Sequence, residues 1–261
     1  MKNNHIKLVC LLLLTLPLFS SAQKNKSGEF YQIILYHFSN ADQQKIIDGY
    51  LKDAYLPALH RQQIKSIGVF TPISNDTAAD KRLYVLFPVK SLQQVTDLNT
   101  RLDADNEYLT NGKEYLDIAF DKPAYSRKEI ILLKAFPLAP FMSLPALKRP
   151  AAERVYELRS YESASENIFH NKVQMFNEGG EISLFKRLNF NAVFYASVIA
   201  GSHMPNLMYM TSFENMADRD AHWKTFSSDP EWKTLSAKPE YKNNVQKNDT
   251  NLMRATSYSD Y

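Results

Sequence analysis

The sequence is poor in cysteine, glycine and tryptophan, with one, seven and two among its 261 residues. The single cysteine, Cys10, excludes a disulfide framework. The few glycines form neither a G-x-G-x-x-G pattern nor a Walker loop, so a nucleotide cradle is not expected. No run of basic residues concentrates the net charge of +3, so nucleic acid is not an expected partner.

The one long apolar run lies at the N-terminus, at Leu8–Phe19. Lys2 and Lys7 precede it and Ser20-Ser21-Ala22 follows it, which is the pattern of a secretory signal cleaved after Ala22. The run is too short for a spanning helix, which needs about 20 residues. We therefore expect residues 1–22 to be a signal peptide and the product to be exported to the periplasm or the extracellular space, with no stable membrane anchor and no cysteine.

The rest of the chain has ordinary globular composition, and its two halves repeat one another. Tyr31–Tyr36 aligns with Tyr156–Tyr161, and 105–108 (DNEY) aligns with 229–232 (DPEW), at an offset of 124–125. Between the halves, Pro137–Pro150 holds four prolines in fourteen residues, which predicts an extended segment. The sequence therefore predicts two modules, 29–136 and 154–261, joined by a proline-rich connector at 137–153.

The residue pattern of each module predicts the element order β-α-β-β-α-β, which is ferredoxin-like. The strands are expected at 30–37, 67–73, 83–89 and 129–135, and then at 155–161, 192–200, 207–213 and 252–258. Later helices are expected to start at the N-caps Ser91, Asp105, Asn215 and Asp229. The first helix of each module is expected to bend or break, at Pro57 in one and at Gly179-Gly180 in the other.

Three segments of the second module, Tyr156–Tyr161 (YELRSY), Tyr209–Phe213 (YMTSF) and Trp223–Trp232 (WKTFSSDPEW), resemble the NIPSNAP family. The resemblance covers the second module throughout and the first more weakly. It implies a ferredoxin-like unit of the dimeric α+β barrel type. The expected fold class is thus α+β, with two tandem ferredoxin-like modules pairing their sheets face to face as a pseudo-dimeric α+β barrel.

The resemblance implies a fold but no reaction, because the activity of the family is not settled. The wider barrel superfamily includes haem-degrading and cofactor-free monooxygenases, which is an analogy at the level of fold. The first module departs from the family pattern, with Asn99, Asn106 and Tyr108 where the second has Trp223, Pro230 and Trp232.

The candidate ligand site is a polar row on the first strand of the second module. Side chains alternate along a strand, so Glu157, Arg159 and Tyr161 share one face, which we expect to line the barrel interior while Tyr156 and Leu158 face the helices. The aligned positions 32, 34 and 36 of the first module are Gln, Ile and Tyr, without charge. One hypothesis makes Arg159 the anchor of a ligand, and the other makes Glu157–Arg159 a structural cross-link.

Five histidines lie beyond the signal: His37, His60, His170, His203 and His222. No spacing among them is typical of a metal site, so no metal is expected. His203, on the loop between two predicted strands, is a candidate to close the mouth of the ligand site. Haem stays open, because one histidine can serve as its axial ligand. The aromatic residues Trp223, Phe226 and Trp232 are interpreted as helix packing.

These observations favour an exported small-ligand-binding or scaffold protein over an enzyme, with no cofactor expected. Two alternatives stay open: an oxygenase or isomerase of the barrel superfamily, cofactor-free or haem-linked, and a haem or porphyrin carrier. The expected partner is a small molecule. The two modules form an intramolecular pseudo-dimer, and assembly into further homo-oligomers stays open.

Overall fold

The computed structural model describes residues 28–261, so the signal peptide predicted at 1–22 lies outside the described residues. The first half contains β1 (Phe30–Phe38), α1 (Ala41–Tyr50), a π-helical turn (Leu51–Tyr55), α2 (Leu56–Arg61), β2 (Gly68–Pro72), β3 (Lys81–Val89), α3 (Leu92–Asp103), α4 (Asn106–Asn111), α5 (Lys113–Leu116) and β4 (Arg127–Ala135). The second half contains β5 (Val155–Glu162), α6 (Glu166–Phe176), α7 (Glu181–Arg187), β6 (Ala192–Ala200), β7 (Asn206–Phe213), α8 (Met216–Ser228), α9 (Pro230–Ala237) and β8 (Lys247–Ala255). Residues 136–154 between them contain neither helix nor strand.

The eight strands form one closed antiparallel barrel in the order β1-β3-β2-β8-β5-β7-β6-β4. Each half contributes a four-stranded sheet, and the two sheets join edge to edge. One seam pairs β2 with β8, and the other pairs β4 with β6. The expected fold class, a pseudo-dimeric α+β barrel made from two ferredoxin-like modules, is confirmed. Closure within one chain leaves neither sheet with a free edge.

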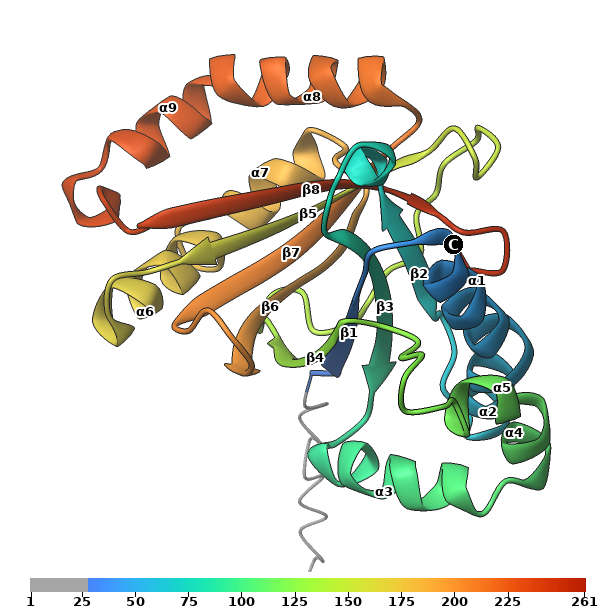
Figure 1. Ribbon diagram of the computed structural model, residues 1–261. Helices are drawn as coiled ribbons and strands as arrows, with labels where there is room; N and C mark the ends of the chain where they lie inside the picture. Colours follow the sequence, from blue (N-terminus) through green and yellow to red (C-terminus); the bar gives the residue numbers. More distant parts are fainter. Residues whose placement is uncertain (1–27) are drawn as a thin grey trace, which may run out of the picture.

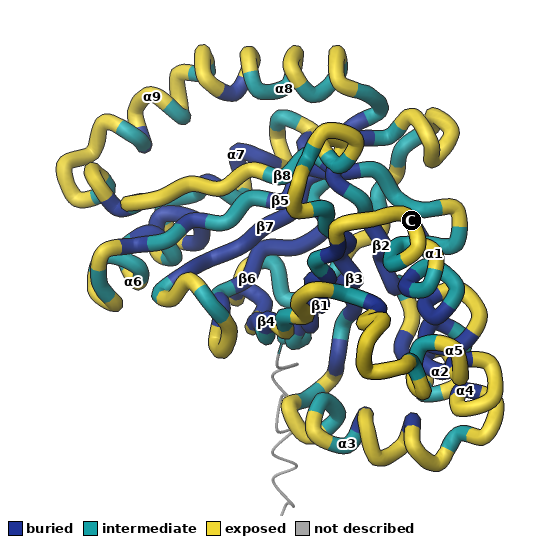
Figure 2. The backbone as a smooth tube through the Cα atoms, viewed as in Figure 1, coloured by how far each residue is buried: buried dark blue, intermediate teal, exposed yellow. Residues whose placement is uncertain are grey.

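The barrel interior is filled by apolar side chains from all eight strands. They include Tyr31, Phe70, Tyr84, Ile131, Tyr156, Phe194, Met208 and Met253. An eight-stranded barrel is just wide enough for side chains to fill. The helices lie outside, with α1–α5 against one half and α6–α9 against the other (Figure 1). The strands are largely buried, whereas the outer sides of α3 and α8 are exposed (Figure 2).

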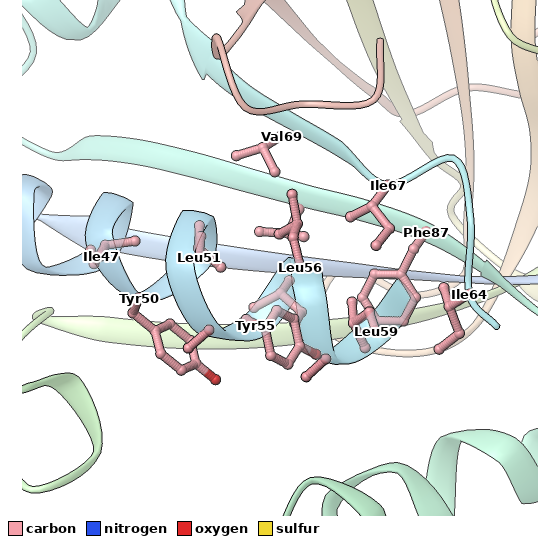
Figure 3. Close-up of a cluster of buried hydrophobic side chains, with 14 of the residues drawn as sticks. Ile47, Tyr50, Leu51, Tyr55, Leu56, Leu59, Ile64, Ile67, Val69 and Phe87 are labelled. Carbon is pink, nitrogen blue, oxygen red and sulfur yellow. The ribbon is translucent and has the colours of Figure 1, made fainter. Parts of the chain in front are cut away.

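The helix layer of the first half packs on the outer face of β1, β2 and β3. Ile47, Leu51 and Leu59 project from α1, the π-helical turn and α2 towards Val69 and Phe87 on the strands (Figure 3). The π-helical turn lies directly before Pro57, whose missing N–H removes one helical hydrogen bond. The expected irregularity at Pro57 is confirmed.

The remaining helix boundaries follow the capping residues seen in the sequence. Ser91, Asp105, Asn215 and Asp229 each accept a backbone N–H of the first helical turn with the side-chain oxygen. In the second half, Gly179-Gly180 separates α6 from α7, as expected. Gly180 adopts a φ of +95°, in the left-handed region that favours glycine.

Gly180 and Gly49 form a matched pair for testing this conformational requirement. An added Cβ meets no atom within 4 Å at either position, so only backbone conformation decides the outcome. Gly180→Ala should destabilise the fold by about 1–2 kcal/mol, because φ is positive there. Gly49→Ala, inside α1, should stabilise it by about 0.5–1 kcal/mol. Urea unfolding measures both free energies, and changes of the same sign would contradict the assignment.

The last strand differs from its prediction of 252–258, because β8 covers Lys247–Ala255. Its first four residues are polar and exposed, so they carry no apolar alternation that marks a strand. Residues 256–261 leave the sheet and pack on the first half. Asp260 donates its backbone N–H to the carbonyl of Ile67, and the Tyr258 hydroxyl donates to Asp48. Tyr261 packs in the barrel interior, its ring 5.3 Å from that of Phe70.

The expected orientation of β5 is wrong. Tyr156 and Leu158 lie in the barrel interior, while Tyr161 packs in the helix layer and Glu157 contacts α8. The two faces of the strand are the reverse of the expected ones: the polar row faces the helices and the apolar residues face the barrel interior. Since β5 is buried on both faces, its apolar residues fit either side. The narrow barrel interior accepts the apolar Tyr156 and Leu158. On the outer face, polar side chains from α8 form hydrogen bonds with Glu157.

Candidate functional site

Glu157 lies at the centre of a polar cluster between β5 and α8. Its side chain is fully buried and accepts hydrogen bonds from three residues. Arg159 Nε donates to Oε1 at 2.6 Å, and Arg219 Nε donates to Oε2 at 2.7 Å. The indole Nε1 of Trp223 donates to Oε2 at 2.8 Å. The carboxylate therefore holds one guanidinium from the strand and one from the helix, and ties α8 to the sheet.

Arg159 is held on three sides. Besides its bond to Glu157, Nη1 donates to the Tyr161 hydroxyl at 3.1 Å, and the guanidinium lies 3.8 Å from the ring centre of Trp223. Tyr161 and Tyr209 share a hydrogen bond of 2.9 Å. Nη2 makes no protein hydrogen bond within residues 28–261, and 15% of the Arg159 side chain is exposed. The cluster thus orients one guanidinium edge towards solvent.

The local sequence explains how α8 presents its partners. Asn215 caps the helix, and Arg219, Trp223 and Phe226 follow at spacings of four and three, which place them on one face. Phe226 is buried in the helix-layer core, where it stacks 5.0 Å from Phe185. The face of α8 that packs on the sheet is thus apolar near the C-terminus of the helix and polar where it contacts Glu157. The interpretation of Trp223, Phe226 and Trp232 as packing aromatics agrees with this core.

The cluster is fully charged at neutral pH. Burial by itself raises the pKa of Glu157, but the hydrogen bond from Arg219 and the charge of Arg159 outweigh it, so the pKa lies below its ordinary value. Burial by itself lowers the pKa of Arg159, but the nearby Tyr209, Tyr161 and Glu157 outweigh it, so the net shift of this pKa is upwards. Two cations therefore share one buried anion. Asp220, which also contacts Arg219, is 62% exposed and screened by water.

A second buried ion pair lies in the same helix layer. Lys172 Nζ on α6 is 2.9 Å from Glu181 Oε2 on α7, and the two side chains are 5% and 4% exposed. The same ammonium lies over the rings of Phe176 and Tyr161, at 4.7 and 5.7 Å. A buried pair of this kind mostly offsets its own desolvation. It fixes the mutual position of α6 and α7 across the Gly179-Gly180 break.

Residues 28–136 contain no counterpart of this cluster. At the positions aligned with Glu157 and Arg159 stand Gln32 and Ile34, and Ile34 lies in the apolar core of the helix layer. Tyrosines fill the remaining space, among them Tyr50 and Tyr108, whose hydroxyls are 2.9 Å apart. The asymmetry read from the sequence is therefore a difference between a second half with a buried Glu–Arg cluster on its first strand and a first half with uncharged residues at the aligned positions.

His203 does not join the polar row. It lies on the β6–β7 loop, where its Nδ1 is 3.1 Å from Glu162 Oε1 and its side chain is 56% exposed. Glu162 follows Tyr161 on β5, so strand alternation turns it to the opposite face. The structure thus brings Glu157, Arg159 and Tyr161 together and leaves His203 apart. A role for His203 at the mouth of this site is not supported.

Sequence reasoning missed Arg219 and the pair Lys172–Glu181. The sequence did contain a signal for a buried Arg219, because this residue stands four residues before Trp223 and therefore on the same helix face. Lys172 had a weaker one, since it lies four residues before the buried Phe176. In both cases a charge on an otherwise buried face indicated a buried partner.

The described residues offer no metal site and no membrane span. No group of three or more histidine, cysteine or acidic side chains within 28–261 converges to hold a metal ion. Within the same range, no helix combines the length and apolar content needed to cross a membrane. Five hollows on this part of the surface are lined by residues outside the polar cluster.

The closed barrel with helices outside both sheets defines a dimeric α+β barrel folded from a single chain. Residues 156–260 match the NIPSNAP family model, so the second module is a NIPSNAP domain. No curated protein matches the sequence. The polar cluster of Glu157 and Arg159 lies within the NIPSNAP domain.

Two solved structures with the same fold span nearly the whole chain, and a third matches less than half of it. A candidate monooxygenase from Lactobacillus acidophilus NCFM is 10% identical, with a TM-score of 0.57, over 87% of this chain and 94% of its own. An anthrone oxidase-like protein is 9% identical, with a TM-score of 0.54, over 88% of this chain and 92% of its own. A NIPSNAP-like domain protein from Burkholderia xenovorans is 18% identical over 42% of this chain and 91% of its own, with a TM-score of 0.37. At these identities the first two likenesses show the fold alone.

Proposed function

We propose that this chain is an exported small-ligand-binding protein, and that Arg159 of the NIPSNAP domain anchors an acidic group of the ligand. One observation carries the proposal: a buried carboxylate orients the Arg159 guanidinium while its Nη2 keeps no protein partner. A guanidinium edge held in this way is suited to a carboxylate or phosphate, because its donors match the two acceptor oxygens.

The surroundings of Arg159 favour a ligand with a flat apolar part. Trp223 stacks on the guanidinium, and Tyr161 lies beside it on the strand. The neighbouring Arg219 is 20% exposed and adds a second positive charge at the surface. An acidic group bound here would meet two guanidinium groups that share the single negative charge of Glu157. Fixed geometry of this kind lowers the entropy cost of binding.

Binding is favoured over catalysis because the cluster lacks a group suited to proton transfer. Glu157 has a lowered pKa and its oxygens already accept from Arg159, Arg219 and Trp223, so it is a poor general base. The alternative, an oxygenase of the barrel superfamily, is supported by the names of the similar structures, a candidate monooxygenase and an anthrone oxidase-like protein. That support is an analogy at the level of fold.

Haem binding has less support. Among the five histidines of the described residues, His170 alone lines one of these five hollows, and it is exposed. An exposed imidazole at the rim does not supply the buried axial position that a haem iron requires. The residues present therefore do not fit haem.

The decisive experiment is native mass spectrometry of the protein recovered from the exported fraction of its own cells. We expect a small-molecule adduct on the wild-type chain that is lost in Arg159→Met. The stability of this variant should fall by about 1–2 kcal/mol, because Glu157 keeps its bonds to Arg219 and Trp223. The same spectrum weighs the chain and tests cleavage after Ala22.

Arg187→Met is the matched control, since Arg187 forms exposed ion pairs with Asp229 and Glu231 on the same domain. It should keep the adduct. An adduct retained by Arg159→Met, or a folded wild-type protein that carries none, would contradict the proposal. A mass that includes residues 1–22 would contradict export with cleavage.

A further inference from the structure

The connector between the two halves covers part of the NIPSNAP domain. Three apolar side chains of the connector itself are open to solvent. Its backbone is fixed, since Ser143 N donates to Val193 O at 2.9 Å and Leu138 N donates to Asn177 Oδ1 at 3.2 Å. Yet Leu138, Phe141 and Leu144 are 59%, 48% and 51% exposed. A fixed segment that exposes three large apolar side chains in seven residues is typical of a binding surface.

A hollow of about 540 Å³ lies between this connector and α7, within the size range of small-molecule sites. Phe185, Phe190 and Tyr195 contribute to its walls, and each is less than 5% exposed. Phe141 and Leu138 line it from the connector side. The hollow is therefore bounded by buried aromatic residues of the domain core and by the exposed apolar side chains of the connector.

Polar residues also line this hollow. Lys186 lines it and forms no ion pair with any residue of the described part of the chain. Asn189 and Asn191, on either side of Phe190, adopt left-handed φ values of 56° and 43°. The Asn191 carbonyl is fixed by the Ser212 hydroxyl at 2.8 Å. The turn thus leaves Phe190 buried in the core, and Asn189 and Asn191 line the hollow together with Lys186.

We propose that this hollow is a second binding site, for a flat, apolar carboxylic acid of the aryl carboxylate class. The ring packs against Leu138 and Phe141 of the connector and the partly exposed Ile182 of α7, over the buried Phe185 and Tyr195, and the carboxylate pairs with Lys186. Charge complementarity selects an acid, because Lys186 is a cation without an acidic partner in the described residues. A neighbouring hollow of about 430 Å³ shares Leu138 as a wall, which leaves space for a substituent on the ring.

This site is independent of the proposed anchor at Arg159. Tyr195 faces the hollow, and Tyr209 stacks behind it at 5.7 Å between ring centres. The Tyr209 hydroxyl then meets Tyr161, which contacts Arg159. A layer of aromatic rings therefore separates the hollow from the polar cluster, and each site can fail without the other.

The test is fluorescence anisotropy of 2-naphthoate with purified full-length protein, and its neutral analogue 2-naphthylmethanol as the comparison. Lys186→Gln should weaken naphthoate binding about tenfold and leave the alcohol unchanged. Ser143→Trp places an indole into the hollow from the exposed connector and should abolish binding of both probes. Ala146→Trp, also on the exposed connector but outside the hollow, is the matched control and should bind both.

Arg159→Met should bind 2-naphthoate as well as the wild type does. Naphthoate binding lost in Arg159→Met but intact in Lys186→Gln would overturn this second site and assign the acid to the polar cluster instead. Absence of naphthoate binding to the wild type would also overturn it. Because Lys186 is exposed, Lys186→Gln decides the question even where Ser143→Trp does not fold.

Discussion

Residues 154–261 expressed without the first half should fail to form a stable monomer. In the intact chain β6 and β8 pair with β4 and β2, so removal of the first half leaves two unpaired strand edges. The inner face of the remaining sheet, including Tyr156 and Met253, would also face water. Each half of the barrel therefore depends on the other for most of its interior.

Size-exclusion chromatography with light scattering and circular dichroism measure this outcome. We expect an unfolded fragment or a dimer in which a second copy replaces the missing half. The matched control is the full chain cut by a protease at a site introduced near Leu144, whose two fragments should stay associated and folded. A monomeric 154–261 fragment with a cooperative thermal transition would contradict the interdependence of the two halves.

Glu157→Ala should lower the free energy of unfolding by about 3–5 kcal/mol, because it leaves Arg159 and Arg219 without their shared partner in a half-buried place. Trp223 also loses the acceptor of its indole N–H. Glu153→Ala is the control, since Glu153 forms an exposed pair with Arg149 and should change stability by less than about 1 kcal/mol. Chemical denaturation of both variants measures the difference. Equal effects would contradict the central position of Glu157.

The same carboxylate should contribute to the pH dependence of stability. The pKa of Glu157 in the folded state lies below the ordinary value of 4.5. Its contribution to the free energy of unfolding is therefore complete above pH 4.5 and is lost as the pH falls through the folded-state pKa. The stability difference between wild type and Glu157→Gln should therefore shrink as the pH is lowered below 4.5. A difference that grows under acid conditions would contradict the assigned direction of the shift.

The sequence predicted the strands and capped helices well, because those elements carry local signals. The caps Ser91 and Asn215 and the breaks at Pro57 and Gly180 act within a few residues, so they are visible without a structure. The first half of β8 was missed for the opposite reason. Its exposed polar residues form a strand only because β5 pairs with them.

The candidate site was predicted in part. The charge asymmetry between Glu157–Arg159 and the positions 32 and 34 was visible in the repeat, and the pairing of Glu157 with Arg159 is present. The face of β5 was assigned wrongly, because both faces of that strand are buried and alternation alone gives no sign of which is inside. Arg219 lies 62 residues from Glu157 in sequence, so their contact depends on tertiary structure.

The central claim is that an acidic ligand binds beside Arg159 and Trp223. The chain has two tryptophans, so a ¹H–¹⁵N spectrum contains two indole signals, which Trp223→Phe and Trp232→Phe assign. When the ligand recovered from the exported protein is added back, the Trp223 indole signal should shift, because its N–H binds Glu157 and its ring stacks on Arg159. The Trp232 signal should stay in place. Ligand binding that leaves the Trp223 signal unmoved would contradict the claim.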